Sequence, residues 1–515
     1  MPRSPARRHT PKRPDPLVHA EDLTERDGGI RATLLSMRAS RSSRVILSGV
    51  GAVVATALLC GSAASVGATA AASTRPGGAH LDRALQAALD RRAAATLRPV
   101  PISGDSDTGP WTTGIPQVTS AATSLPSTSG RVASTDADLT WSIRASLFTR
   151  GSVPQIGASA SGQVVDAVTG RVLWAKNPTT ARTPASNQKI VTAFVALASM
   201  GASARLTTPV LQVPSSPATV YLKGAGDPAL SSSQLGTMAT TVAAKAKSQG
   251  LAAVTVVVDD SLFPEPTNAP GWKPEWIPHT VAPVRALVVD QVNVVDTSLH
   301  AGQVFAARLK AAGVAASTVR RGAAPAGATT IASVTSPTVA QLVQTMLNAS
   351  QTDYAETLHR LAALRRGHTP DWAGARTNAI QVLTAGGIDQ AGMVVNDGSG
   401  LSRTGRMTPL TAIDLVSTIR AIPAQNAVIF AASGMPTSGV SGTLESRYRT
   451  APTSCARSAV RAKTGTLADV VALSGVSTGV DGRERVFSVI VNGVTSTDAA
   501  RADVDALAAT STGCY

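Results

Sequence analysis

The chain has 515 residues, 43% apolar and 15% charged, which is enough for about two or three domains with a sizeable core. Its formal net charge is +15, but the basic residues are scattered and aromatic residues make up only 3%. Nucleic-acid binding is therefore not expected, since stacking surfaces need more aromatic residues, and the charge favours anionic envelope polymers or membrane surfaces instead.

The N-terminal part is organised around an apolar run at residues 45–73, which contains no charged residue. A basic arm, residues 1–44, precedes it, and small residues close it, a pattern typical of an export signal. The run is also long enough to remain as a membrane anchor. Either the arm is a cytoplasmic tail or translation begins at Met37. Both alternatives predict export, and membrane attachment through this run stays open.

Residues 74–136 read as a spacer that holds the folded part away from the membrane. A short helix is expected at 81–97, and Ser, Thr, Pro and Gly then dominate from 99 to 134. Such a composition is too polar and too broken to build a core.

The folded part is expected to begin near Trp141 with a β-hairpin formed by 163–166 and 172–174. Ser186 and Lys189 follow, and we expect them to open a helix that stops at Gly201. Its apolar face is formed by Ile190, Val191, Phe194, Val195, Leu197 and Ala198.

Between residues 206 and 332 the pattern changes to short valine-rich strands separated by Pro and Gly turns. Examples are 219–222 and 254–258. We interpret this stretch as an inserted α+β region. The glycines at 224 and 226 do not form a dinucleotide-binding fingerprint, because Pro228 follows where a helix should open.

Helical periodicity returns at Ser336-Pro337, which reads as a cap with proline in the first turn, and continues over 339–347. A second helix is predicted from near Asp353. The last part of the chain predicts a loop at 396–400 and a strand at 463–466. A second hairpin, formed by 470–476 and 486–491 around a turn at 481–482, and a closing helix at 497–509 follow.

Cysteine and histidine usage gives no sign of a metal site or cofactor. No C-x-x-C occurs, and the seven histidines form no cluster with ligand spacing. Cys455 and Cys514 could form a disulfide in an exported protein, and two free thiols are the equally open alternative.

The candidate catalytic pair is Ser186 and Lys189. Their spacing places both side chains on one face of a helix, one turn apart. A lysine in a dry pocket can be neutral and can accept the serine proton, which would make Ser186 the nucleophile and Lys189 the base. The hydroxyl of Ser350 could then relay the proton to a leaving amine.

A second group of candidate residues, at 463–466, would bind the substrate. Lys463 would bring positive charge to a substrate carboxylate and Thr464 would hydrogen-bond to it. Gly465 would allow close approach of a backbone, and the amides of Ser186 and Thr466 are candidates for an oxyanion hole. Each short pattern is weak by itself, but the ordered set is much more specific.

From about Trp141 to its end, the chain resembles the high-insert D-alanyl-D-alanine carboxypeptidases, the class C low-molecular-mass penicillin-binding proteins. The motifs that carry the resemblance are PASNQK at 184–189, GDP at 226–228, VDDSLF at 258–263, APGW at 269–272, NDGSGLSR at 396–403, GTL at 442–444 and AKTGT at 462–466. Asp227, Asp259 and Asp397 fall within these motifs, although turn formation explains acidic residues in such loops equally well.

The resemblance implies an α+β fold of the serine β-lactamase/DD-transpeptidase type, with a catalytic domain at 137–205 and 333–515. The insert at 206–332 would separate it from compact β-lactamases. It also implies a substrate, peptidoglycan stem peptides ending in D-Ala-D-Ala, and covalent inhibition by β-lactams.

The second motif departs from the family pattern Ser-x-Asn. Ala355 and Glu356 keep the register of Ser350, but Thr352 stands where the asparagine is expected. In the family that amide contacts the lysine and the peptide group of the substrate. Threonine is shorter and has only a hydroxyl, so substrate binding through Thr352 would be weakened, retuned or lost.

Four functions are weighed on these observations. The first is an exported DD-peptidase, acting as a carboxypeptidase or as an endopeptidase on cross-links. The second is a wall-binding or scaffold protein with a weakened site, and the third is a β-lactamase. An α/β-hydrolase is suggested only by the G-x-S-x-G run at 475–479, which falls in a strand and hairpin and is taken as structural.

Overall fold

The structure is a computed structural model that describes residues 133–153 and 159–515. The basic arm, the apolar run and the predicted helix at 81–97 lie outside the described residues, as does the spacer up to residue 132. Among the helices that the structure describes, none is both long and apolar enough to span a bilayer.

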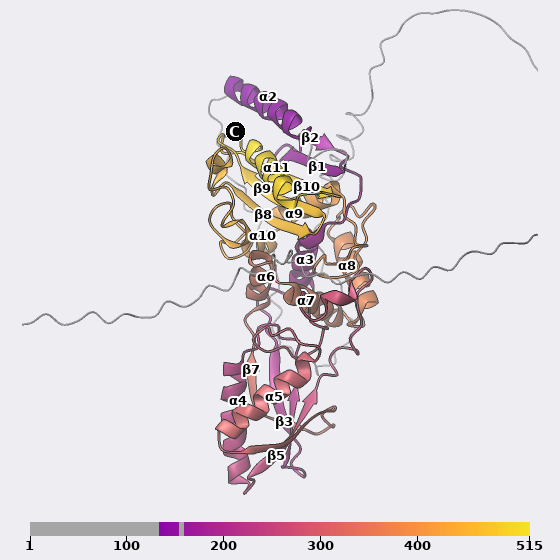
Figure 1. Cartoon of the computed structure of the whole chain (residues 1–515), viewed down its shortest axis with the longest axis vertical. Coiled ribbons are helices and arrows are strands. Elements are labelled where there is room, and N and C mark those ends of the chain that lie inside the picture. Colours follow the sequence, from indigo (N-terminus) through magenta and orange to yellow (C-terminus); the bar gives the residue numbers. More distant parts are fainter. Residues whose placement is uncertain (1–132, 154–158) are drawn as a thin grey trace, which may run out of the picture. The chain divides into compact units, whose positions relative to one another are not determined.

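The first sheet is antiparallel, with the strand order β2-β1-β10-β9-β8 (Figure 1). Its strands are β1 (Ala160–Asp166), β2 (Val172–Lys176), β8 (Val460–Leu467), β9 (Val470–Thr478) and β10 (Glu484–Asn492). Both predicted hairpins are confirmed. Strands far apart in sequence meet where β1 pairs with β10, and β8 forms one edge of the sheet.

Helices cover both faces of this sheet, because its central strands are apolar on both sides. In β10, Val486 joins the core shared with the helices, whereas its neighbour Phe487 points to the opposite face. That opposite face is covered by α11 (Thr497–Thr510), against which α2 (Ala133–Arg150) also packs. The other face is covered by α9 (Pro409–Ala421).

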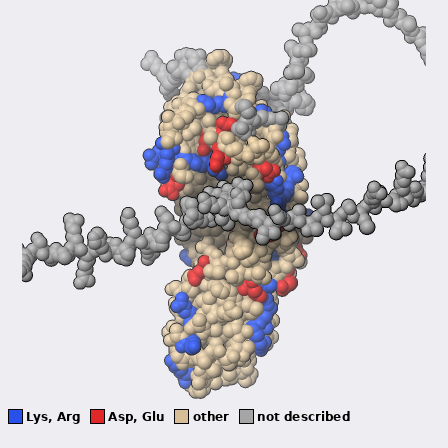
Figure 2. All heavy atoms as spheres, in the orientation of Figure 1, with Lys and Arg blue, Asp and Glu red and all other residues tan. Residues whose placement is uncertain are grey.

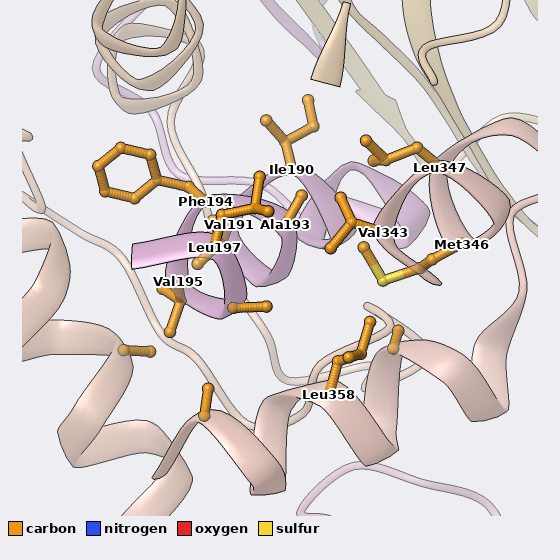
Figure 3. Packing of buried hydrophobic residues seen from close by; sticks show 14 of the residues in the cluster. Ile190, Val191, Ala193, Phe194, Val195, Leu197, Val343, Met346, Leu347 and Leu358 are labelled. Atoms are coloured by element: carbon orange, nitrogen blue, oxygen red, sulfur yellow. The ribbon is translucent and has the colours of Figure 1, made fainter. Parts of the chain in front are cut away.

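The core beneath the first face is organised around α3 (Gln188–Met200), a predicted helix that ends at Gly201 in a positive-φ conformation. Apolar side chains of α3 meet those of α6 (Val339–Asn348) and α7 (Thr352–Arg365), as Figure 3 shows. The catalytic lysine candidate therefore sits at the start of a helix that is buried along most of its length.

The second sheet has the order β6-β5-β4-β3-β7 and mixes parallel with antiparallel pairs. Its elements are β3 (Thr207–Gln212), β4 (Thr219–Lys223), α4 (Ser232–Ser248), β5 (Ala253–Asp259), α5 (Thr297–Ala311), β6 (Ala315–Arg321) and β7 (Thr329–Thr335). Apolar residues of α4 and α5 pack on the sheet and form a separate core. The strands expected at 219–222 and 254–258 are confirmed as β4 and β5.

Two predicted boundaries are wrong. Helix α6 begins after Thr338, whose side chain and Gln341 form a capping box, so Ser336 is not the cap. Helix α2 begins at Ala133, within the stretch interpreted as spacer. Further helices are α8 (Trp372–Ala385), α10 (Pro423–Ile429) and the 3₁₀ turns η3 (Pro274–Trp276), η4 (Gly442–Leu444) and η5 (Thr453–Ala456).

Cys455 and Cys514 form a disulfide that ties η5 to the C-terminal end. Of the two alternatives for these cysteines, the structure has the bonded one. On the face that Figure 2 shows, basic and acidic side chains are interspersed among uncharged surface, as expected from the scattered charges of the sequence.

Candidate active site

Ser186 lies in a tight 3₁₀ turn, η2 (Ala185–Asn187), directly before α3. The expectation that Ser186 lies on the α-helix itself is therefore wrong by one turn. Ala185, directly before Ser186, has a φ of +47°, which is incompatible with a right-handed helix at this position. A non-glycine residue held in this region is strained, and such strain clusters at functional sites.

Lys189 is in hydrogen-bond contact with the nucleophile candidate. Its Nζ lies 3.0 Å from Ser186 Oγ and 3.0 Å from the backbone oxygen of Ser399, and its side chain is 1% exposed. Burial lowers the pKa of Lys189 to about 8, against the charges of Glu356, Asp397 and Asp353, which raise it. The amine can therefore become neutral in a mildly alkaline medium and accept the serine proton.

The loop at 396–400 forms the wall behind the lysine. Gly400 has a φ of +79°, and a Cβ there would lie 1.8 Å from the backbone oxygen of Ala185. A Cβ on Gly398 would lie 2.4 Å from the backbone oxygen of Ala355 on α7. The two glycines thus let the loop fit between the nucleophile turn and α7.

Two buried carboxylates hold this loop. Asp397 accepts hydrogen bonds from the backbone N–H groups of Gly400 and Ser402 and from Trp272 Nε1. Glu356 accepts one from Gly398 and one from Ser399. Burial raises the pKa of both carboxyl groups.

Strand β8 lies on the other side of the nucleophile. A Cβ on Gly465 would lie 2.8 Å from the backbone oxygen of Pro184, so this glycine permits the close approach that the sequence predicted. Because β8 is an edge strand, it has backbone groups that the sheet leaves unpaired. An oxyanion hole that includes the amide of Thr466 fits this arrangement and stays a prediction.

Lys463 is completely buried, and its Nζ donates to the backbone oxygen of Thr464 at 3.0 Å. Burial lowers the pKa of Lys463 well below its usual value, and the charges of Lys189 and Arg447 lower it further. Because Lys463 has no exposed surface, the predicted attraction of a substrate carboxylate by Lys463 would act through Thr464 and not by direct contact. The Thr464 hydroxyl is held by that of Thr443, 2.7 Å away.

The second motif lies between α6 and α7. Ser350 has a φ of +57°, and Thr352 is the first residue of α7. Gly442 lies close to this segment, since a Cβ there would be 2.5 Å from the backbone oxygen of Asn348. The next residue, Thr443, hydrogen-bonds to Thr464, so η4 connects the second motif with β8. In the part of the chain that the structure describes, no hydrogen bond joins the side chains of Ser350 or Thr352 to Ser186 or Lys189.

A family model covers most of the chain: residues 144–295 and 288–513 match the D-Ala-D-Ala carboxypeptidase 3 (S13) family. The chain belongs to that family. It is 33% identical to carboxypeptidase DacB of Mycolicibacterium smegmatis over 70% of this chain and 82% of the relative. It is 34% identical to a carboxypeptidase of Mycobacterium tuberculosis over 68% of this chain and 79% of that protein.

The crystal structure of penicillin binding protein 4 from Haemophilus influenzae aligns with a TM-score of 0.62 and 19% identity. The alignment covers 70% of this chain and 97% of the Haemophilus protein. The fold implied by the resemblance, a DD-transpeptidase-like α+β fold with an inserted region, is thereby confirmed.

Two contributors to this S13 site, Glu356 and Ser399, were not among the predicted site residues. Glu356 served only to set the register of the second motif, and Ser399 acts through its backbone oxygen, which no sequence pattern reveals. A signal was nevertheless present for Glu356. It lies between Ala355 and Leu358 in the sequence, and both of these apolar residues are buried in α7. An acidic residue among buried apolar residues is unusual unless it has a partner.

Other candidate residues have structural roles. Ser477 of the G-x-S-x-G run is buried inside β9 and hydrogen-bonds to Ser511, so it is no nucleophile elbow. Asp227 and Asp259 accept backbone N–H groups two residues ahead, as turn-forming residues do.

Proposed function

We propose that this S13 family member is an exported serine DD-peptidase that acts on peptidoglycan stem peptides ending in D-Ala-D-Ala. Acylation of Ser186 would release the terminal D-alanine, and water would then hydrolyse the acyl-enzyme. The relatives named carboxypeptidase support the reaction class. The same site would also cut cross-links, since a cross-link presents the same type of D-alanyl peptide bond.

Each step has a residue suited to it. Neutral Lys189 takes the proton of Ser186 as Oγ attacks the carbonyl carbon, and the backbone amides of Ser186 and Thr466 stabilise the oxyanion. The proton passes through Ser350 to the leaving amine. Thr464 binds the carboxylate of the terminal D-alanine, with Lys463 behind it. A β-lactam would acylate Ser186 in the same way.

Export is supported by two independent features. The apolar run at 45–73 has the pattern of a signal or anchor, and a disulfide joins Cys455 to Cys514. Disulfides form and persist mainly outside the cytoplasm.

The observation that carries this proposal is the contact of 3.0 Å between a fully buried Lys189 and Ser186. The test is release of D-alanine from a stem pentapeptide. Wild-type protein should release it, and Ser186→Ala should not, at equal thermal stability. Equal release by the two proteins would contradict the assignment of Ser186.

Thr352 favours a second candidate function, a wall-binding protein with a weakened site. Such a protein would bind peptidoglycan but would release no D-alanine, so the same assay separates the two functions when it is combined with a sedimentation assay on isolated cell walls.

A further inference from the structure

Glu356 occupies a position on α7 from which it reaches the loop behind the active site. Its side chain is completely buried. Oε2 accepts the N–H of Gly398 at 2.9 Å, and Oε1 accepts the N–H of Ser399 at 2.8 Å. One carboxylate therefore holds two successive peptide groups.

The same two loop residues hold α3 through their carbonyl groups. The oxygen of Gly398 accepts from Thr192 Oγ1 at 2.6 Å, and the oxygen of Ser399 accepts from Lys189 Nζ at 3.0 Å. Each loop residue is thus fixed by Glu356 on one side and by α3 on the other. A shift of the Glu356 side chain would move the carbonyl group that orients the lysine amine.

Glu356 also acts on Lys189 through its charge. The charged or titratable groups that face Lys189 are Glu356 and Asp353 on α7, Asp397 in the loop and Lys463 on β8. Among the acidic groups, Glu356 raises the pKa of Lys189 most. Burial and the nearby charge of Asp397 raise the pKa of Glu356 itself.

We propose that Glu356 is a positioning residue of the acylation step, which aims the Lys189 amine at Ser186 through Gly398 and Ser399. Glu356 does not itself touch the nucleophile, since its hydrogen bonds go to the loop. This role of Glu356 rests on the proposed acylation of Ser186.

The test is the rate of acylation by a fluorescent penicillin, measured from about pH 6 to about pH 10 for wild type and Glu356→Gln. The amide keeps the shape but has one acceptor oxygen for two N–H groups, so the loop is held less firmly. We expect the alkaline plateau rate to fall about tenfold or more, because small misplacements of reacting groups are costly. In the plot of acylation rate against pH, the part where the rate rises, here called the limb, should also move to lower pH by about one unit, because a nearby negative charge is lost.

The position of the limb separates positioning from simple loss of structure, since a destabilised protein would react more slowly at every pH with its limb unmoved. A Glu356→Gln plateau rate equal to that of wild type, or a limb that coincides with the wild-type limb, overturns the inference. Wild-type protein that takes no label overturns the proposed function together with this inference. Glu484→Gln is the matched control. Glu484 lies on β10 and pairs with Arg420 of α9, so its substitution should leave rate and limb unchanged.

If Glu356→Gln does not fold, as judged by thermal unfolding, Glu356→Asp carries the test. Aspartate keeps the charge but is one methylene shorter, so it cannot hold both N–H groups at the same distance. The rate is measured at a temperature at which thermal unfolding shows the aspartate variant to be fully folded, so that unfolding cannot lower it. We then expect an unshifted limb with a plateau rate reduced about tenfold. A plateau equal to that of wild type would overturn the inference.

Discussion

Lys189 can accept the proton of Ser186 only after it has lost its own. Because burial lowers its pKa to about 8, the neutral fraction rises as pH increases through that value. The acylation rate with penicillin should therefore increase about tenfold per pH unit below the pKa of Lys189 and level off above it. Stopped-flow acylation rates across this range are the measurement, and a rate that is flat from pH 6 to about pH 9 would contradict the role of Lys189 as base.

Thr352 is the residue at which this chain departs from the family motif. Its position at the start of α7 places it one residue before Asp353, whose charge acts on Lys189. Asparagine at 352 would restore a longer side chain that can both donate and accept. Thr352→Asn should therefore raise the acylation rate constant by about tenfold, the effect of one additional hydrogen bond to the substrate.

The matched control for Thr352→Asn is Thr352→Ser, which keeps the hydroxyl and removes only a methyl group. It should react at nearly the wild-type rate. If the asparagine variant is also no faster than wild type, Thr352 is not what limits the site.

At the scale of elements, the loop at 396–400 matters because it is wedged against the nucleophile turn. Gly400→Ala would place a methyl group against the backbone oxygen of Ala185, where a Cβ would lie only 1.8 Å away. The new methyl group and the Ala185 oxygen are both attached directly to the backbone, so neither can rotate away and the backbone of the site must shift. We therefore expect the acylation rate to fall by about a hundredfold. Penicillin labelling rates measure this directly.

Gly387 provides the control for this substitution. It also has a positive φ, +69°, but nothing lies within 4 Å of its Cβ position. Gly387→Ala should cost about 1 kcal/mol of unfolding free energy for the backbone conformation alone and leave acylation unchanged. Equal loss of acylation in the two variants would mean that conformational strain, and not the wedge, explains the effect.

The elements that the sequence predicted well are those with a clear local pattern. The hairpin of β1 and β2, the helix α3 and the strands β8, β9 and β10 combine alternating or helical apolar spacing with turn residues. Helix α2 was missed because large exposed apolar residues obscure the helical spacing of its buried ones. It buries Ile143 and Leu147, but Trp141 and Phe148 are 73% and 72% exposed.

The candidate nucleophile and base were predictable from their side chains, whereas Glu356 and the backbone around the pair were not. The sequence indicated Ser186, Lys189 and the strand at 463–466, because their residue types and spacing carry the chemistry. It placed Ser186 on the helix, because the positive φ of Ala185 is imposed by tertiary packing. The support of Lys189 by the Ser399 carbonyl depends on a contact across 210 residues, which no local pattern reveals.

For the whole molecule, the disulfide between Cys455 and Cys514 closes a loop with a sequence separation of 59. Such a cross-link restricts the unfolded chain, so the double variant Cys455→Ser/Cys514→Ser should lose about 2–4 kcal/mol of unfolding free energy. Denaturant unfolding under non-oxidising conditions for the variant and under native conditions for wild type measures this difference. Acylation by the folded variant should be unchanged, since neither cysteine belongs to the site. An unchanged midpoint of unfolding would show that the bond contributes no stability.

The central claim is that Ser186 forms the acyl-enzyme. It is tested most directly by treating the purified protein with a penicillin and locating the adduct by intact and peptide mass spectrometry. We expect one adduct for each chain, on the peptide that contains Ser186, and none in Ser186→Ala. An adduct on another residue, or no adduct on folded wild-type protein, would contradict it.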